Sequence, residues 1–136
     1  FYGKDEFLLG AHATGANDFI GGAFNVILPL VKECLAAFDA GRIEDARAAN
    51  HRIVDVVAVL RRFGGLPAVK ATMELLGVPC GPLMQPLRTV SELDRHLLFD
   101  ALLQAWPEVN EVMSGTPLET AALQSADGQS AAGRHR

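Results

Sequence analysis

Two acidic residues near the beginning of the chain are suited to binding a ligand. Asp5 and Glu6 follow closely after Gly3. Glycine lets a ligand approach the backbone, and ionised carboxylates accept hydrogen bonds from hydroxyl groups. Adjacent side chains on a helix point about 100° apart, which disfavours joint acid and base catalysis by this pair. The pattern therefore indicates binding of sugar hydroxyl groups. The alternative is a helix start whose acids only stabilise the helix dipole.

A glycine pair forms a second candidate site. Gly21 and Gly22 follow the apolar residues Phe19 and Ile20. Glycines can bring backbone N–H groups close to a bound group. The complete phosphate-loop pattern, which needs Lys followed by Ser or Thr, is absent here. Gly21 and Gly22 are therefore predicted either to contact a ligand through the backbone or simply to form a tight turn.

The remaining reactive side chains form no recognisable catalytic or metal site. A lysine becomes a Schiff-base nucleophile when burial lowers its pKa, but each lysine here is predicted to lie on the solvated surface. Cys34 and Cys80 lack C-x-x-C spacing, and we expect Cys34 to be a buried apolar residue. The lysines are Lys4, Lys32 and Lys70, and the histidines on separate predicted helices are His12, His51 and His96. We therefore expect no metal, no cofactor and no disulfide framework.

Length and composition are those of one soluble globular domain. The chain has 136 residues, of which 49% are hydrophobic, and its formal net charge is −4. This charge supplies no basic field for nucleic acid or for an anionic membrane surface. The longest apolar stretch, residues 26–31, is far shorter than the roughly 20 residues of a membrane-spanning helix. We expect a cytoplasmic protein that binds neither nucleic acid nor membranes.

Two short strands are predicted to alternate with two helices in residues 1–41. The strands are residues 1–2 and 18–20, where β-favouring side chains run into glycine. The helices occupy the intervening residues and are stopped by Gly15 and Gly41. This order predicts a parallel βαβ unit with a right-handed crossover. Two isolated strands leave unpaired backbone groups, so we expect the chain to be cut from a longer sequence that supplies flanking strands.

Three further helices are predicted in residues 42–113. Apolar periodicity places the first two at 43–63 and 67–76. The third begins with Ser91 as its N-cap and ends near Trp106, which is predicted to be a packing anchor. The predicted buried positions are Ile43, Ala46, Ile53, Val57 and Leu60 in the first helix, Val69, Met73 and Leu76 in the second, and Leu93, Leu97, Ala101 and Leu102 in the third.

Two segments are predicted to be irregular. Residues 78–87 contain three prolines, which exclude a regular helix. Residues 114–136 consist mainly of small and polar residues, so their burial cannot offset the entropy of ordering them. We expect this tail to be disordered.

The order of the motifs resembles one known family. The motifs are Gly3-Lys4-Asp5-Glu6, Gly15-Ala16, Ile20-Gly21-Gly22-Ala23-Phe24-Asn25, Pro29, Gly81-Pro82 and Pro86-Leu87. This series resembles the C-terminal part of the dihydrodipicolinate synthase and N-acetylneuraminate lyase superfamily, and in particular the N-acetylneuraminate lyases.

The resemblance implies an α/β fold, a TIM (β/α)8 barrel followed by three additional helices. Residues 1–41 would be its seventh and eighth βα units, and 42–113 its helical extension, so that this part of the barrel is mostly helical. Such a barrel takes about 250 residues. The family is normally homotetrameric and consists of class I aldolases. Its imine-forming lysine, proton-transferring tyrosine and carboxylate-binding loop would all precede Phe1, which implies that this chain alone is inactive.

The resemblance also implies a substrate. Gly3, Asp5 and Glu6 match the motif that holds the polyhydroxyl tail of sialic acid in these lyases, and Gly21 and Gly22 belong to the same binding edge. The lyases commonly have a serine at the position of Gly22. The implied reaction cleaves sialic acid to pyruvate and N-acetylmannosamine through a lysine Schiff base. The alternatives are dihydrodipicolinate synthase, another sugar-acid aldolase or dehydratase, or a non-catalytic helical interaction module.

Overall fold

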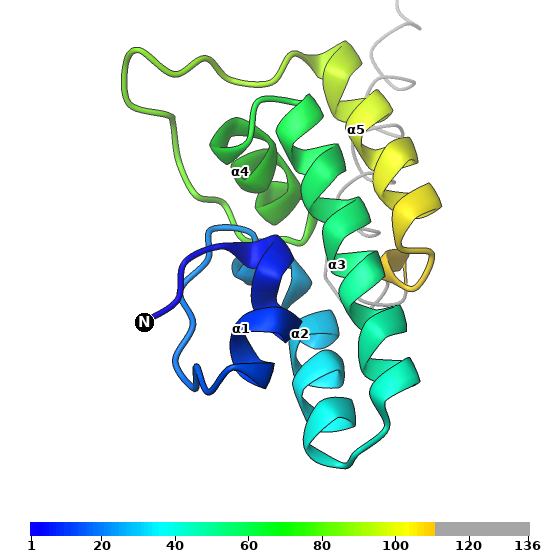
Figure 1. The fold of residues 1–136 in the computed structure, drawn as a ribbon. Coiled ribbons are helices and arrows are strands. Elements are labelled where there is room, and N and C mark those ends of the chain that lie inside the picture. The colour runs from blue at the N-terminus through cyan, green and yellow to red at the C-terminus, as the bar shows by residue number, and fades with distance from the viewer. Residues whose placement is uncertain (111–136) are drawn as a thin grey trace, which may run out of the picture.

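A computed structural model describes residues 1–110 of the chain, and these residues are mostly helical (Figure 1). The predicted tail, residues 114–136, lies outside the described part. In chain order the elements are the 3-10 helix η1 (Asp5–Phe7) and the α-helices α1 (Leu8–Ala13), α2 (Phe24–Asp39), α3 (Ile43–Arg62), α4 (Leu66–Leu75) and α5 (Glu92–Ala105). The predicted helices are therefore all present.

The two predicted strands are reduced to a single parallel bridge between Tyr2 and Phe19. The Tyr2 N–H donates to the Asp18 carbonyl at 2.9 Å, and the Ile20 N–H donates to the Tyr2 carbonyl at 3.0 Å. The parallel direction agrees with a βαβ arrangement. Within residues 1–110 the two predicted strands do not extend beyond this bridge, because no third segment there pairs with either of them and two short segments alone do not sustain a sheet.

Helix α2 contains a kink where the sequence places its proline. Ile27 has non-helical dihedral angles of φ −98° and ψ 16°, and Pro29 lies just beyond it. Proline has no N–H to donate and fits the first turn of a helical segment, so the prediction of Pro29 in a first turn is confirmed for the segment after the kink. Gly41 lies in the short connection between α2 and α3. Its φ of 73° is a conformation that favours glycine.

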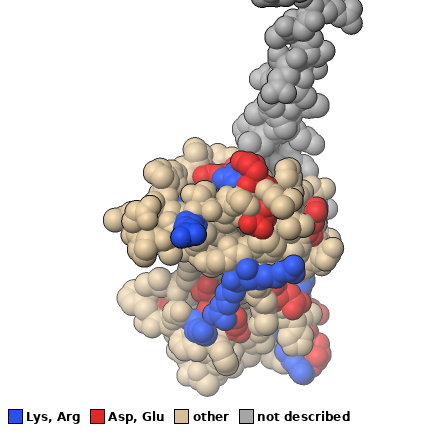
Figure 2. Space-filling model, turned by 90° about the horizontal axis from the view of Figure 1, so that it is seen from above, with Lys and Arg blue, Asp and Glu red and all other residues tan. Residues whose placement is uncertain are grey.

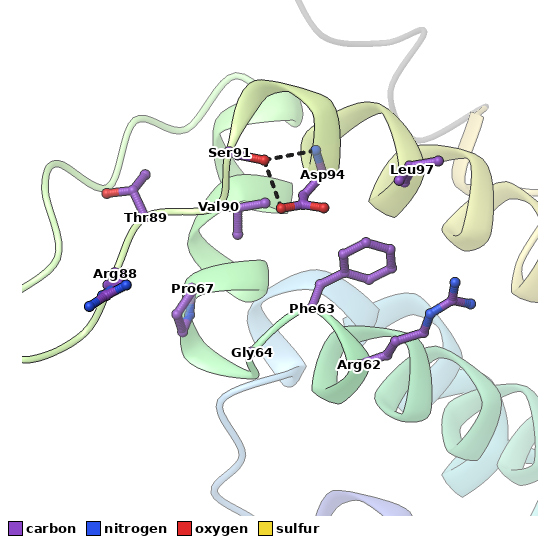
Figure 3. A pocket seen from close by; sticks show the side chains of 10 residues that line it. All are labelled: Arg62, Phe63, Gly64, Pro67, Arg88, Thr89, Val90, Ser91, Asp94 and Leu97. Atoms are coloured by element: carbon purple, nitrogen blue, oxygen red, sulfur yellow. Dashed lines mark hydrogen bonds between the residues drawn. The ribbon is translucent and has the colours of Figure 1, made fainter.

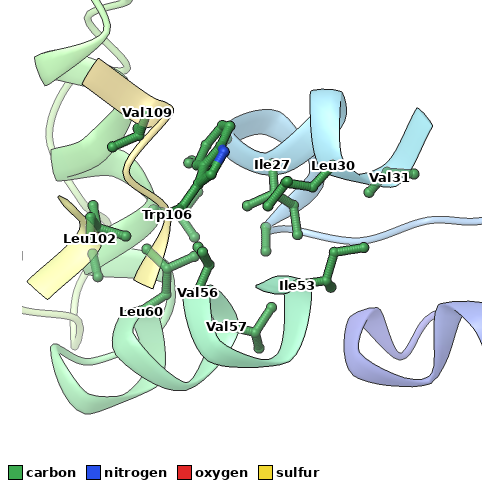
Figure 4. Close-up of a cluster of buried hydrophobic side chains, with 14 of the residues drawn as sticks. Ile27, Leu30, Val31, Ile53, Val56, Val57, Leu60, Leu102, Trp106 and Val109 are labelled. Carbon is green, nitrogen blue, oxygen red and sulfur yellow. The ribbon is translucent and has the colours of Figure 1, made fainter. Parts of the chain in front are cut away.

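Helices α2 and α3 form an antiparallel pair around the core (Figures 1 and 4). Cys34 of α2 is fully buried, and its thiol donates to the Ala46 carbonyl of α3 at 3.4 Å. Burial raises the pKa of Cys34 to about 11, with a smaller contribution from the Glu33 charge, so the thiol stays neutral. The prediction that Cys34 is an apolar core residue is confirmed.

Helix α3 buries one face against its neighbours, as its periodicity predicts. The buried residues are Ala46, Ala49, Ile53, Val56, Val57 and Leu60. Ile43, which we expected in the same face, is exposed because it is the first residue of the helix and lies beyond the packed core. The remaining arginines and acids of α3 occupy its other face, where Arg47 pairs with Glu44.

Helix α5 confirms the predicted burial of Leu102 but not that of Leu93 and Leu97. Leu98 and Leu102 are buried together with Trp106, whereas Leu93 and Leu97 are 71% and 47% exposed. Both stripes have the four-residue spacing of a helical face. The buried stripe is the one that continues into the large indole of Trp106, whose role as a packing anchor is confirmed (Figure 4).

Ser91 caps α5, as its position in the sequence predicts. Its hydroxyl accepts the Asp94 N–H at 3.1 Å and donates to the Asp94 carboxylate at 2.7 Å. We expect Ser91→Ala to lower the free energy of unfolding by about 1 kcal/mol, because one helical N–H loses its partner. Ser91→Thr keeps the hydroxyl and should lose at most a few tenths. Urea denaturation measures both variants, and equal losses would contradict the capping role.

Lys70 of α4 is not the solvated side chain that the sequence predicts. Its ammonium donates to the carbonyls of Cys80, Gly81 and Pro82 at 3.0, 3.3 and 3.0 Å. These carbonyls belong to the predicted irregular segment, which has no helix or strand. Lys70 therefore holds the connector between α4 and α5 against α4. Lys4 and Lys32 are exposed, as expected.

Charges on the described surface are mixed. Figure 2 shows basic and acidic side chains interspersed on the face seen from above. Arg52 of α3 pairs with Glu33 of α2 and with Glu108 beyond α5, and Arg95 of α5 pairs with Glu74 of α4. Within residues 1–110, no helix combines the length and hydropathy required to cross a bilayer.

Candidate functional site

The structure brings the two candidate motifs together through the carboxylate of Asp5. Asp5 follows the bridge residue Tyr2 and begins η1. Its Oδ2 accepts the Ala23 N–H at 3.2 Å, while its Oδ1 is buried without a hydrogen-bond partner among the described residues. A Cβ added to Gly21 would lie 1.8 Å from this Oδ1. Gly21 therefore leaves the space in which the carboxylate sits.

Partial burial governs the ionisation of Asp5. Loss of solvent raises the pKa of its carboxyl from 3.8, and the nearby Glu6 charge raises it further. The Ala23 N–H and, to a smaller extent, the charges of Arg61 and Lys4 lower the pKa. A buried polar atom without a partner is rare in folded proteins and requires an explanation.

Asp5 lines a small cavity of about 190 Å³. The cavity lies between the loop after the bridge and the turn that joins α3 to α4. Its other lining residues are Gly22, Ala23, Val57, Leu60, Arg61, Gly65, Leu66 and Val69. Whole small-molecule sites commonly occupy about 300 to 1,000 Å³, so this cavity has the size for one part of a ligand. Its single carboxylate among mainly apolar walls suits a group that donates hydrogen bonds.

Glu6 is directed away from this cavity. Its side chain is 14% exposed and pairs with the guanidinium of Arg61, and it is not among the lining residues. The side chains of Asp5 and Glu6 point in different directions, as expected for adjacent residues of a helix. The sequence alone does not predict the pairing of Arg61 with Glu6, because the two residues lie 55 positions apart and no local pattern connects them. Arg61 thus joins η1 to the end of α3.

The other predicted glycines differ in how closely they are packed. A Cβ on Gly3 would lie 3.6 Å from the Ile20 carbonyl, an ordinary contact distance. A Cβ on Gly22 would meet nothing within 4 Å. Gly22 also lines the cavity, so a side chain at this position would have room beside Asp5. Gly3 and Gly21 are not among the residues that line it.

His12 holds the helix after the bridge in place. Its Nε2 lies 2.8 Å from the Asp39 Oδ1, and its Nδ1 lies 3.0 Å from the Ala16 carbonyl. The ring makes edge contacts with Phe19 and Phe38 and is 14% exposed. Two acceptors around one imidazole favour its doubly protonated form. The hydrogen bond to Asp39 is the main reason that the pKa of His12 is raised from 6.5.

We expect His12→Gln to remove a pH-dependent part of the stability. The raised pKa makes the folded state bind the proton more tightly than the unfolded state does. This contribution is complete below about pH 6.5 and is lost as the pH rises through the folded pKa. The free energy of unfolding is measured in urea at about pH 5.5 and about pH 8.5. Between these two pH values it should fall more for the unmodified chain than for His12→Gln. Parallel losses in the two proteins would contradict this role.

Within the described part of the chain, no three His, Cys, Asp or Glu side chains are grouped so that they would hold a metal ion. His12, His51 and His96 lie on α1, α3 and α5 respectively. The candidate site is therefore defined by Asp5 and its cavity.

A parallel bridge, a helical crossover and a carboxylate beyond the bridge are features of α/β proteins, in which ligands bind at the carboxyl ends of parallel segments. The model of the dihydrodipicolinate synthetase family matches residues 1–105. The chain belongs to this family.

Curated relatives and solved structures agree with this assignment. The chain is 36% identical over 113 residues to N-acetylneuraminate lyase of Rhizobium meliloti, an alignment that covers 79% of the chain and 37% of that enzyme. It is 35% identical over 91 residues to 4-hydroxy-tetrahydrodipicolinate synthase 1 of Streptomyces coelicolor, covering 65% of the chain and 30% of the synthase. The structure of N-acetylneuraminate lyase from Aliivibrio salmonicida is similar with a TM-score of 0.71 at 30% identity, covering 76% of this chain and 35% of that one. The chain thus spans about a third of the length of these relatives.

Proposed function

We propose that this chain is the C-terminal part of a pyruvate-dependent lyase of the N-acetylneuraminate lyase type. The single observation that carries the proposal is the half-buried Asp5 carboxylate, which lines a cavity and has one oxygen without a partner. A substrate hydroxyl would donate to the Asp5 carboxylate, which the proposed binding would bring into contact with the sugar tail. The similarity to the Rhizobium meliloti lyase supports the choice of substrate class.

In this proposal, the chain supplies the sugar-binding edge and not the reacting groups. Residues 1–41 form the seventh and eighth βα units of a TIM barrel, and residues 42–113 form the helical extension. A lysine and a tyrosine from the remaining barrel carry the chemistry. The lysine imine acts as the electron sink when the carbon–carbon bond breaks, which releases N-acetylmannosamine and leaves pyruvate as its enamine. The assembled enzyme is a cytoplasmic homotetramer.

Each predicted site residue has a defined part in this arrangement. Asp5 accepts a hydroxyl of the sugar tail, and Gly21 keeps the Asp5 carboxylate in position. Gly3 and Gly22 leave the backbone open to the tail. Glu6 acts through Arg61, because its carboxylate is already paired with that guanidinium.

A grafting experiment tests the proposed function. The matching C-terminal segment of the Rhizobium meliloti lyase is replaced by residues 1–110 of this chain, and cleavage of N-acetylneuraminate is measured. We expect an active hybrid whose kcat/KM falls at least about tenfold with Asp5→Ala, through loss of a hydrogen bond to a charged group. The matched control is Asp45→Ala, since Asp45 is an exposed acid at the start of α3 and does not line the cavity. A folded, inactive hybrid would contradict the proposal.

A second experiment tests the expectation that the catalytic lysine lies outside this chain. The 136-residue protein is treated with pyruvate and borohydride, which traps imines as stable adducts. We expect no stoichiometric increase in mass. An adduct on Lys4, Lys32 or Lys70 would overturn the assignment of the Schiff base to the remaining barrel.

A synthase-type activity is the second candidate, because the chain is also 35% identical to the Streptomyces coelicolor synthase. The same segment grafted into that synthase and assayed for condensation of pyruvate with aspartate semialdehyde separates the two candidates. The Asp5 cavity favours the lyase, since it adds a hydroxyl acceptor to the site. Higher activity in the synthase background would favour the second candidate.

A further inference from the structure

A second and larger cavity lies on the other side of the turn between α3 and α4. Its volume is about 620 Å³, within the range of small-molecule sites. It is bounded by the end of α3, the start of α4 and the start of α5, as Figure 3 shows. None of its lining residues also lines the Asp5 cavity. The two cavities are therefore separate sites.

This cavity contains the two arginines of residues 1–110 that form no ion pair. The five other arginines there each contact a carboxylate, namely Arg42, Arg47, Arg52, Arg61 and Arg95. Arg62 and Arg88 have no such partner in the described part, and both line the cavity. Figure 3 shows them at opposite sides of it, with Pro67 and Phe63 between them. Two guanidinium groups are thus available to anionic groups of a ligand.

The acid in this cavity does not neutralise the arginines. Asp94 accepts the Ser91 hydroxyl at 2.7 Å, and its charge lies in the first turn of α5, where the helix dipole stabilises it. The lining therefore carries two positive charges and one negative charge. In a chain with a net charge of −4, a cavity of opposite sign selects anions locally.

The walls between the arginines are apolar. Phe63, Pro67, Val90 and Leu97 all line the cavity. The guanidinium carbon of Arg62 lies 5.4 Å from the centroid of the Phe63 ring. This cation–π contact holds the guanidinium near the ring and leaves N–H groups available for a carboxylate. A ligand that matches this arrangement has a flat apolar body with an anionic group at each end.

We propose that this cavity binds a small organic dicarboxylate with a flat apolar body, held at its two ends by Arg62 and Arg88. Each carboxylate accepts paired N–H donors from one guanidinium, and the body lies against Phe63 and Pro67. This site goes beyond the proposed lyase function and requires none of its residues. Its occupant would link the end of α3 to the connector that precedes α5.

Titration of the ¹⁵N-labelled chain with benzene-1,4-dicarboxylate at low ionic strength tests the proposal. We expect saturable shifts of the Gly64, Thr89 and Val90 amides. Arg62→Gln and Arg88→Gln should each weaken binding about tenfold, the effect of losing one charged hydrogen-bonding partner. Arg47→Gln is the matched control, because it makes the same change in net charge at a pair remote from the cavity. It should change binding less than about twofold.

Two further ligands test whether binding requires negative charge and whether it requires two carboxylates. Benzene-1,4-dicarboxamide has the same shape without charge, and benzoate has only one carboxylate. We expect the diamide not to bind and benzoate to bind about tenfold more weakly than the dicarboxylate. Absence of saturable shifts, equal binding of the diamide or benzoate, or equal effects of all three arginine variants would overturn the proposal.

Discussion

Replacing Trp106 by alanine is expected to lower the free energy of unfolding by about 3 to 5 kcal/mol. The indole is 2% exposed and lies between α2 and α3 at the end of α5. Figure 4 shows it next to Ile27 and Val56. Alanine would leave a cavity where three helices meet, and these helices have no rigid sheet behind them within residues 1–110. Small domains have about 5 to 15 kcal/mol of stability, so the loss is a large fraction of the total.

The matched control is Leu93→Ala on the same helix. Leu93 is exposed, so its truncation should change the stability by no more than about 0.5 kcal/mol. Urea denaturation followed by far-ultraviolet circular dichroism measures both variants. Similar losses for the two would contradict the assignment of Trp106 to the core.

Gly21→Ala is expected to lower the free energy of unfolding by about 2 kcal/mol and to displace Asp5. The new methyl group would lie 1.8 Å from the Asp5 Oδ1 and 2.7 Å from its Cγ. Relief of this clash requires the short side chain of Asp5 to leave the Ala23 N–H. The cost thus combines overpacking with a lost hydrogen bond to a charged acceptor. The Ala23 amide resonance should shift along with the loss of stability.

Gly22→Ala provides a control one residue away. Its methyl group meets nothing within 4 Å, so the stability should change by no more than about 0.5 kcal/mol. Gly22→Ser should fold equally well and place a hydroxyl in the Asp5 cavity. In the grafted lyase, Gly21→Ala should reduce cleavage of N-acetylneuraminate, whereas Gly22→Ser should retain it. A folded Gly21→Ala variant with an unshifted Ala23 amide would contradict the steric argument.

Elements with strong local signals could be predicted from the sequence. Pro29 and Gly41 mark the ends of helical segments, and Ser91 satisfies a backbone donor within its own turn. These interactions join residues close in sequence, so the pattern contains both partners. The same applies to the alternation of buried and exposed residues along α3.

Features that depend on distant neighbours could not be predicted. In α5, Leu93 and Leu97 have the same four-residue spacing as Leu98 and Leu102, and only packing against other helices selects the second pair for burial. The two predicted strands form only a bridge because no third segment within residues 1–110 pairs with them. The same distinction applies to the candidate site. The motif Gly3-Lys4-Asp5-Glu6 places Asp5 just after the bridge, as expected from the sequence. The pairing of Glu6 with Arg61 could not be predicted, because it depends on α3 packing beside η1.

The three hydrogen bonds of Lys70 concentrate the anchoring of residues 78–87 on one amino group. Because that nitrogen already donates to Cys80, Gly81 and Pro82, acylating reagents should modify it more slowly than the exposed Lys4 and Lys32. Once acylated, the nitrogen has a single N–H to donate and no charge. The segment would then detach from α4 and become the preferred protease cleavage site within residues 1–110, while the helices around Trp106 stay intact.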